Sequence, residues 1–282
     1  MTIYHLGLAG YPLSHSLSPQ LHTAALKACG LQGDYSLFPI HPDDQQGLKD
    51  LLARIRTGEI QGLNITIPHK QTAIELLDEL TPVAKAIGAV NTIYVRGNKL
   101  IGDNTDAPGF LSDLHQFLSN RQSKIVNRKS AIVLGAGGSA RAVVYALLND
   151  GWNVAIAARR IEQAQQLASS LSNYQLQITG LTLPSLQSLI SDLVLIINTT
   201  PLGMTPKTDQ SPLPADLSLP SNAFVYDLVY NPHETKLVRD ARAQGLSATT
   251  GLGMLLEQAA LSFELWTGYK PPREILYASV VE

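Results

Sequence analysis

The sequence has a single cysteine, Cys29, in 282 residues. An intramolecular disulfide is therefore excluded, and the chain fits a reducing compartment. No apolar run approaches the roughly 18–20 residues that cross a bilayer, and the N-terminus MTIYHLGLAG lacks the basic start of a secretion signal. We therefore expect a cytoplasmic protein that makes no membrane contact.

Charge is also scarce in this chain. Charged residues make up 16% of it and the formal net charge is −2, whereas charged residues are about a quarter of a typical soluble domain. No basic patch dominates, so we expect no nucleic-acid partner. Solenoid repeats and low-complexity tracts are absent, and residues 201–220, rich in Pro, Ser, Thr and Asp, predict a loop. The length and the 45% hydrophobic content allow two domains with buried α/β cores.

The most informative stretch is AIVLGAGGSAR, residues 131–141, which predicts a strand, a tight turn and a helix. Gly135 suits a turn conformation closed to other residues. Gly137 leaves the backbone open to a phosphate, and Ala140 lets the helix pack close to the strand. Free N–H groups at the helix start would point at a diphosphate. An ordinary strand–helix turn is the alternative, but the position between a strand and a helix favours a dinucleotide site.

The strand predicted at residues 152–158 is followed by Arg159 and Arg160. In dinucleotide-binding folds, an acid about 20 residues past the glycines binds the ribose 2′-hydroxyl, whereas arginine accommodates a 2′-phosphate. No acid stands at this position, so the pattern favours NADP(H) over NAD(H). The alternative is a pair of solvated arginines.

Periodic apolar patterns predict the remaining elements. In the first half they are strands at 3–9, 35–40 and 62–68, helices at 18–29, 42–56, 69–80 and 109–118, and a β-hairpin at 88–103. In the second half they are strands at 131–134, 193–198, 224–229 and 247–250, and helices at 140–148, 251–266 and 272–280. The apolar strand 193–198 is expected to be central and buried. The polar stretch 121–129 breaks the pattern, and we expect a domain junction between the hairpin and Ser130.

Several polar side chains lie where predicted elements begin or end. Ser16 and Ser18 precede or begin a helix, which suits a small carboxylate, although Ser18 is also readable as a cap and Ser16 as a loop residue. Lys70 follows a strand end, where ligands gather and where a lysine donates a proton or holds an alkoxide. The alternative for Lys70 is a solvated first-turn lysine. Asp106 lies near a helix start, either as a catalytic acid or as an ordinary helix-start residue.

The helix expected from residue 251 places Met254 and Gln258 on one face, one turn apart. Core packing for Met254 and solvent exposure for Gln258 are the plainer alternatives.

Eight motifs, in order along the chain, resemble the shikimate dehydrogenase family. They are GYPLSHSLSP, NITIPHK, GAVNT, GDNTD, GAGGSAR, NTTPLGM, YDLVYNP and GLGMLLEQAA. The resemblance implies a two-domain α/β fold with a central cleft. A mixed α/β substrate domain would contain residues 1–105 and 252–282, and a Rossmann-like NADP-binding domain would contain residues 106–251. The implied activity is the reversible reduction of 3-dehydroshikimate to shikimate by NADPH, in chorismate and aromatic amino acid biosynthesis. The implied partners are this small-molecule substrate and NADP(H), with no metal, in a monomer or homodimer.

The resemblance also implies roles for individual residues. Lys70 and Asp106 match the catalytic pair. The positions that match substrate-binding residues are Ser16, Ser18, Thr66, Asn91, Tyr230 and Gln258. The positions that match the cofactor site are Gly135, Ala136, Gly137, Gly138, Ser139, Ala140, Arg141, Arg159, Arg160, Thr199, Leu228, Gly251 and Met254. Of these, Thr199, Leu228, Gly251 and Met254 match the nicotinamide end.

The chain departs from the family after the second Rossmann strand. The family often has Asn-Arg-Thr there and a further arginine three residues on, whereas this chain has Ala158, Arg159, Arg160 and Gln163. Arg160 is the candidate to compensate, and the departure weakens the expected NADP preference without reversing it. A quinate or quinate/shikimate dehydrogenase that uses NAD or NADP is the nearest alternative. A non-catalytic NADP-binding regulator would lack the Lys70–Asp106 pair, and an amino-acid-type dehydrogenase would lack the serine-rich loop.

Overall fold

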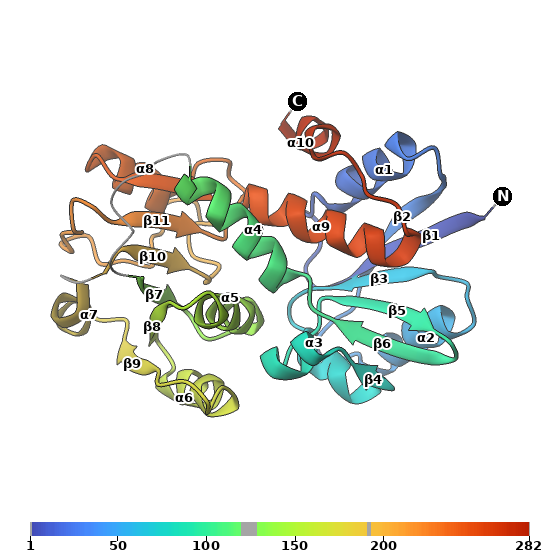
Figure 1. Cartoon of the computed structure of the whole chain (residues 1–282), viewed down its shortest axis with the longest axis horizontal. Helices are drawn as coiled ribbons and strands as arrows, with labels where there is room; N and C mark the ends of the chain where they lie inside the picture. The colour runs from blue at the N-terminus through green and yellow to red at the C-terminus, as the bar shows by residue number, and fades with distance from the viewer. Residues whose placement is uncertain (1, 120–128, 191–192, 282) are drawn as a thin grey trace. The chain divides into compact units, whose positions relative to one another are not determined.

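The computed structural model describes residues 2–119, 129–190 and 193–281. The chain divides into two compact units, each with its own six-stranded sheet (Figure 1). Unit 1 contains Met1–Gly109 and Leu255–Glu282, and unit 2 contains Phe110–Met254. The predicted two-domain α/β class is confirmed, whereas the central cleft and the assignment of substrate and cofactor to particular domains stay predictions. Most of the polar stretch predicted to break the pattern, residues 121–128, lies outside the described residues.

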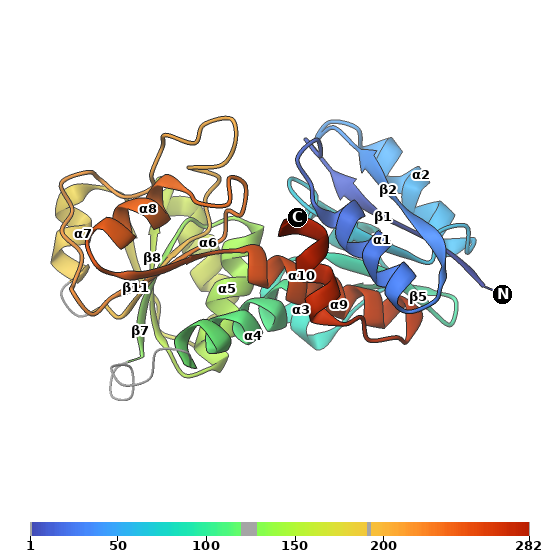
Figure 2. The ribbon, with the colours of Figure 1, turned by 90° about the horizontal axis from the view of Figure 1, so that it is seen from above.

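Unit 1 has a mixed sheet with the strand order β2-β1-β3-β5-β6-β4. Its strands are β1 (Ile3–Gly10), β2 (Gln32–Pro39), β3 (Gly62–Ile65), β4 (Glu79–Leu80), β5 (Thr92–Arg96) and β6 (Lys99–Asp103). Its helices are α1 (Ser18–Ala28), α2 (Gln45–Arg56), the 3-10 helix η1 (Thr72–Leu76), α3 (Pro82–Ile87) and α10 (Arg273–Val281). Helices α4 (Asp106–Ser119) and α9 (Leu252–Thr267) contain residues of both units. Helix α1 packs against β2 and α10 (Figure 2).

Strand direction in unit 1 follows the connections. β1 is parallel to β2 and β3, which are reached through helices, whereas β5 and β6 form the predicted antiparallel hairpin. Helix α2 buries Leu48, Leu51, Leu52 and Ile55 on one face, as the periodicity predicts. It begins at Gln45 rather than at residue 42 because the Asp44 side chain accepts a hydrogen bond from the backbone N–H of Gly47 (2.8 Å) and caps it.

Unit 2 has an all-parallel sheet with the order β12-β11-β10-β7-β8-β9. Its strands are β7 (Ser130–Leu134), β8 (Asn153–Ala158), β9 (Gln177–Gly180), β10 (Leu195–Asn198), β11 (Phe224–Asp227) and β12 (Ser247–Thr250). Its own helices are α5 (Gly138–Asn149), α6 (Ile161–Ser170), α7 (Leu183–Ile190) and α8 (Lys236–Ala243). All four residues of β10 are buried near the middle of the sheet, so the predicted central strand is confirmed. No helix or strand interrupts residues 201–220, all of them described, which confirms the predicted loop.

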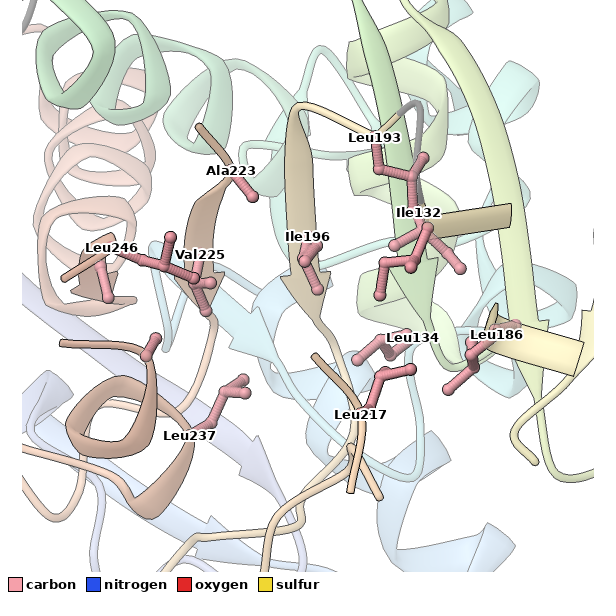
Figure 3. Close-up of a cluster of buried hydrophobic side chains, with 14 of the residues drawn as sticks. Ile132, Leu134, Leu186, Leu193, Ile196, Leu217, Ala223, Val225, Leu237 and Leu246 are labelled. Atoms are coloured by element: carbon pink, nitrogen blue, oxygen red, sulfur yellow. The ribbon is translucent and has the colours of Figure 1, made fainter. Parts of the chain in front are cut away.

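The core of unit 2 explains why its strands read as apolar runs. Ile132, Ile196 and Val225 come from neighbouring parallel strands, and Leu186 of α7 and Leu237 of α8 pack with them (Figure 3). A parallel sheet is covered by helices on its faces, so its strands need apolar side chains in both directions.

One predicted element is wrong. The pattern over residues 69–80 predicts a helix, but the chain makes a turn, then η1, and then β4. The backbone N–H of Asp78 donates to the carbonyl of Leu100 (3.1 Å), and that of Thr81 donates to the carbonyl of Gly102 (2.9 Å). Pairing with β6 therefore replaces the helical bonds, and Lys70 lies in a turn rather than in a first helical turn.

Other differences concern helix starts and unpredicted elements. Leu17 occupies the N-cap position of α1 without a side-chain hydrogen bond, so the reading of Ser18 as a cap is wrong. Helix α4 begins at Asp106, three residues before the predicted start. The elements that the patterns missed are β4, α3, α6, β9, α7 and α8. No helix in the described part of the chain is long and apolar enough to cross a membrane.

Candidate active site

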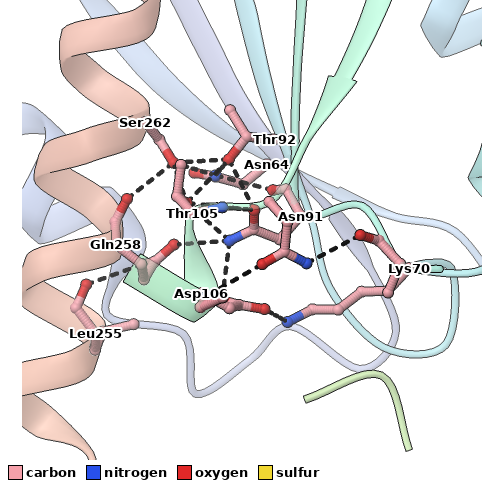
Figure 4. Close-up of polar contacts among 12 residues, drawn as sticks. Asn64, Lys70, Asn91, Thr92, Thr105, Asp106, Leu255, Gln258 and Ser262 are labelled. Atoms are coloured by element: carbon pink, nitrogen blue, oxygen red, sulfur yellow. Dashed lines mark hydrogen bonds and ion pairs between the residues drawn. The ribbon is translucent and has the colours of Figure 1, made fainter. Parts of the chain in front are cut away.

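A buried ion pair joins the two predicted catalytic residues within unit 1. The ammonium of Lys70 donates to Asp106 Oδ2 at 2.5 Å, and the two side chains are only 10% and 6% exposed (Figure 4). The turn that carries Lys70 is held to the sheet region by the N–H of Val90, which donates to the carbonyl of Lys70 (2.7 Å). Asp106 is the first residue of α4, where a carboxylate is favoured by the helix dipole.

Asn91 supplies the second contact to Asp106, and its orientation is unambiguous. The backbone N–H of Thr105 is a donor, and it lies 2.7 Å from Asn91 Oδ1. The amide nitrogen of Asn91 therefore faces Asp106 Oδ1 (2.9 Å) and Thr105 Oγ1 (2.9 Å). Each oxygen of Asp106 thus accepts from a different residue, an ammonium on one side and an amide on the other, as suits an ionised carboxylate.

Gln258 joins this cluster from α9. Its side chain is 8% exposed, so the alternative of a solvent-facing glutamine is wrong. Its Oε1 lies 3.4 Å from Asn91 Nδ2, and its Nε2 donates to the carbonyl of Leu255 (2.9 Å). A Cβ at Gly109 would lie 2.8 Å from the backbone nitrogen of Gln258, so the glycine allows α4 and α9 to approach closely at this point. Met254 is buried, as in the core-packing alternative.

Behind these residues lies a layer of buried hydroxyls that the sequence patterns missed. Ser262 Oγ contacts Thr92 Oγ1 (2.8 Å) and Thr105 Oγ1 (3.0 Å) and donates to the carbonyl of Gln258 (2.9 Å). Asn64 donates to Ser262 Oγ (3.0 Å). Ser262 follows Gln258 by four residues on α9, and that spacing was the available signal.

The remaining substrate candidates lie in loops or, for Ser18, at the first residue of α1. In unit 1, Ser16 Oγ accepts from the backbone N–H of Ser18 (3.3 Å), so the two serines lie together. Thr66 lies beside the end of β1, where a Cβ at Gly10 would meet its methyl group at 2.3 Å. Tyr230 belongs to unit 2 and follows β11 in a loop, where its side chain is half-buried.

The predicted phosphate turn lies at the carboxyl end of β7 in unit 2. Gly135 has φ +115°, and a Cβ there would meet Thr199 Oγ1 at 2.6 Å, so glycine is required and Thr199 lies against the turn. Helix α5 has Gly137 at its N-cap, so no N-cap side chain accepts from its first N–H groups. A Cβ at Gly137 would meet no atom within 4 Å. The open backbone and uncapped helix start fit a diphosphate.

The other cofactor candidates of unit 2 are also placed. Arg159 and Arg160 follow β8, and both are exposed. A Cβ at Gly251 would lie 2.3 Å from the carbonyl oxygen of Leu228, so the strand-to-helix turn before α9 passes directly against the loop after β11. Ala136 precedes the N-cap of α5. The first turn of that helix contains Gly138, Ser139 and Ala140, and Ala140 is fully buried. Within the described residues, no group of three or more His, Cys, Asp or Glu could hold a metal ion.

Comparison with known proteins gives matches along most of the chain. Family models described as "Shikimate dehydrogenase substrate binding domain", "Shikimate / quinate 5-dehydrogenase" and "Shikimate 5'-dehydrogenase C-terminal domain" match residues 8–93, 118–222 and 251–280. The shikimate dehydrogenase (NADP(+)) of Shouchella clausii is 39% identical over 96% of this chain and 95% of its own length.

Solved structures match equally well. The shikimate 5-dehydrogenase of Thermus thermophilus, in complex with NADP(H) and shikimate, superposes with a TM-score of 0.84 at 36% identity, over 98% of each chain. The quinate dehydrogenase of Corynebacterium glutamicum, in complex with NAD, superposes with a TM-score of 0.87 at 31% identity, over 99% of each chain. The chain belongs to the shikimate dehydrogenase family.

Proposed function

We propose that this chain catalyses the reversible reduction of 3-dehydroshikimate to shikimate with NADPH. The observation that carries the proposal is the buried pair of Lys70 and Asp106, held by Asn91, in a member of this family. Unit 1 would bind the substrate. Unit 2, with its parallel sheet and glycine turn, would bind the cofactor.

The reaction requires a hydrogen-bond and proton donor at the keto oxygen of the substrate. The bound cofactor would supply a hydride to the keto carbon, so negative charge develops on that oxygen. A lysine ammonium has three N–H donors, and the bond to Asp106 uses one of them. Lys70 is therefore assigned to stabilise the developing alkoxide and to donate its proton. Asp106 orients Lys70 and accepts a hydrogen bond from the neighbouring hydroxyl of the substrate.

Six further residues are proposed to hold the substrate. The hydroxyls of Ser16 and Ser18, assisted by Tyr230, would bind the carboxylate. Thr66, Asn91 and Gln258 would bind ring hydroxyls or the carboxylate side of the pocket. Because Asn91 and Gln258 are buried and contact one another beside Asp106, they favour a small, polar substrate over a large one.

In the cofactor site, the backbone around Gly137 would hold the diphosphate, and Arg159 and Arg160 would contact a 2′-phosphate. The Corynebacterium relative in complex with NAD, together with Ala158 and Gln163 at positions where the family often has Asn and Arg, keeps a quinate/shikimate dehydrogenase as the second candidate. The Lys70–Asp106 pair disfavours a non-catalytic regulator. We also propose a cytoplasmic location and a monomer or homodimer.

An activity matrix tests the proposal. Purified protein is assayed with shikimate and with quinate, each with NADP+ and with NAD+. The proposal expects the highest kcat/KM for shikimate with NADP+. Higher kcat/KM with quinate would favour the second candidate, and no turnover of either acid with either cofactor would overturn the proposal.

A further inference from the structure

One buried carboxylate of unit 2 has no role in the reaction as described above. Asp227 is the last residue of β11 and is fully buried. It accepts three hydrogen bonds, from Asn198 Nδ2 (2.8 Å), the backbone N–H of Val229 (3.0 Å) and Thr235 Oγ1 (2.6 Å). These donors belong to the end of β10, the loop after β11 and the cap of α8. One side chain therefore joins three segments at the carboxyl edge of the sheet.

The surroundings of Asp227 suit a charged carboxylate. The Asn198 amide nitrogen and the Val229 N–H are donors only. Thr235 Oγ1 accepts from the N–H of Val238 (3.3 Å), so its own proton is free to turn toward Asp227. Burial opposes the charged form and raises the pKa of Asp227 to about 6, with the three hydrogen bonds acting in the other direction.

The charge of Asp227 is not fixed by an ion pair in the described residues. The titratable side chains of the loop after β11 and of α8 are Tyr230, His233, Glu234, Lys236, Arg239, Asp240 and Arg242. Lys236 pairs with Asp240 (2.6 Å) and Arg242 pairs with Glu234 (2.7 Å), while His233 and Arg239 are exposed. The residues in register with Asp227 are the uncharged Asn198 of β10 and Thr250 of β12. Whether Asp227 is ionised therefore depends on the balance between burial, which disfavours the charged form, and its three hydrogen bonds, which favour it.

Asn198 transmits the restraint to a second loop. Its Oδ1 accepts from the N–H (2.9 Å) and the hydroxyl (2.7 Å) of Thr200. Because its Nδ2 donates to Asp227, the amide is held in this orientation. Asp227 therefore restrains the loop that begins with Thr199 and, through Val229, the loop that begins with Leu228. Both loops carry residues assigned to the nicotinamide end.

We propose that Asp227 is a positioning residue for the nicotinamide end of the cofactor site. Ionised, it fastens the loops at residues 199–204 and 228–232 to one another, and when protonated it loosens them. It acts through Asn198, Val229 and Thr235. The kinetic consequence rests on the proposed function, whereas the restraint on the two loops does not.

Kinetics of Asp227→Asn give the first test. Misplacement of the nicotinamide lowers kcat by about tenfold at pH 8, while the affinity for NADP+ changes by less than about threefold because the charge-assisted hydrogen bonds to the phosphates remain. The wild-type kcat contains an ionisation near pH 6 that the variant lacks. Asp240→Asn, which removes a half-buried acid of α8 that pairs with Lys236 and does not contact Asp227, is the matched control and keeps the wild-type profile.

Two variants of Thr235 distinguish the proposed role of Asp227 from a folding defect in Asp227→Asn. Thr235→Val removes the hydroxyl at constant shape and lowers kcat in the same direction as Asp227→Asn. Thr235→Ser keeps the donor and lies closer to wild type. Equal kcat values for the two Thr235 variants would contradict the proposal.

Amide hydrogen exchange measures the restraint without the reaction. The N–H groups of Thr200 and Val229 lose protection in Asp227→Asn at pH 8, and in the wild type when the pH falls below 6. Loosened loops in a protein that turns over neither shikimate nor quinate would support the positioning role while overturning the proposed function. Unchanged protection together with an unchanged kcat profile would overturn the positioning role.

Discussion

At the residue scale, the Lys70–Asp106 pair combines burial with charge. We expect Lys70→Ala to lower kcat at least about a hundredfold, because the donor at the keto oxygen is lost, with little change in KM. It also leaves the nearly buried Asp106 without its cation, at a cost of about 3–5 kcal/mol in the free energy of unfolding. We expect Asp106→Asn to lower kcat as well. Steady-state kinetics and urea denaturation measure the two effects, with Lys85→Ala, an exposed lysine of α3, as control. A kcat near wild type would remove Lys70 from the mechanism.

His22 links stability to pH. Its ring is 1% exposed, stacks on Tyr35 at 4.4 Å between centroids, and has no hydrogen-bond partner for either nitrogen among the described residues. Burial lowers its pKa to about 3, and the nearby Asn64 opposes this only in part. The unfolded chain takes up a proton below pH 6.5 and the folded chain does not, so stability present above pH 6.5 is lost as the pH falls toward 3.

We therefore expect His22 to cost the wild type about 2 kcal/mol of unfolding free energy between pH 8 and pH 5. His22→Phe keeps a ring against Tyr35 and removes this loss, whatever its constant effect on packing. Urea denaturation of both proteins at the two pH values gives the difference. Identical losses in the two proteins would mean that His22 is protonated in the folded state.

Some of the residues of this site could be predicted from the sequence and others could not. Lys70 follows a predicted strand end and Asp106 lies near a predicted helix start, so local sequence was sufficient to select them, whereas Asn91 was selected only by the resemblance to the family. Ser262 was missed because its partners Thr92 and Thr105 are 170 and 157 residues away in the chain, and only the fold brings them together.

At the element scale, the same distinction between local and distant partners holds. The parallel strands β7, β8, β10 and β11 of unit 2 were predictable because each is an apolar run bounded by turns, whereas β9, which has no buried residue, was missed. The segment 69–80 has helical periodicity, but its end pairs with β6, which lies some 20 residues further on, and the pattern carries no sign of that partner. The unpredicted helices α6 and α8 are short amphipathic segments; α6 has no side-chain cap, and the only cap signal of α8 is Thr235.

The start of α5 gives a prediction at this scale. Gly137 has φ −83° and open space around its missing Cβ, so alanine is tolerated by the fold. We expect Gly137→Ala to change the unfolding free energy by less than about 1 kcal/mol, and to raise KM for NADPH because a methyl group would occupy the approach of the diphosphate. Gly135→Ala, at φ +115° and facing Thr199 Oγ1, destabilises the unit itself. An unaltered KM in Gly137→Ala would place the diphosphate elsewhere.

At the scale of the whole molecule, membership of the family does not by itself determine which cofactor the protein uses. Identity of 39% over 96% of the chain establishes the family, yet relatives of the same fold include structures in complex with NADP(H) and with NAD. We expect the choice to depend on the few residues after β8. Here Arg159 and Arg160 are exposed, and no acid stands at the end of that strand to bind a free 2′-hydroxyl.

Arg159→Ala tests that choice directly. Loss of a guanidinium at a 2′-phosphate raises KM for NADPH by about tenfold or more, since a charge-assisted hydrogen bond contributes about 1.5–3 kcal/mol. NADH carries no 2′-phosphate, so its KM stays unchanged. Arg160→Ala measures in the same way whether Arg160 compensates for the arginine that Gln163 replaces. Equal changes for NADPH and NADH in both variants would show that neither arginine reads the phosphate, and the preference would then have to arise from the glycine turn and the loops at the nicotinamide end.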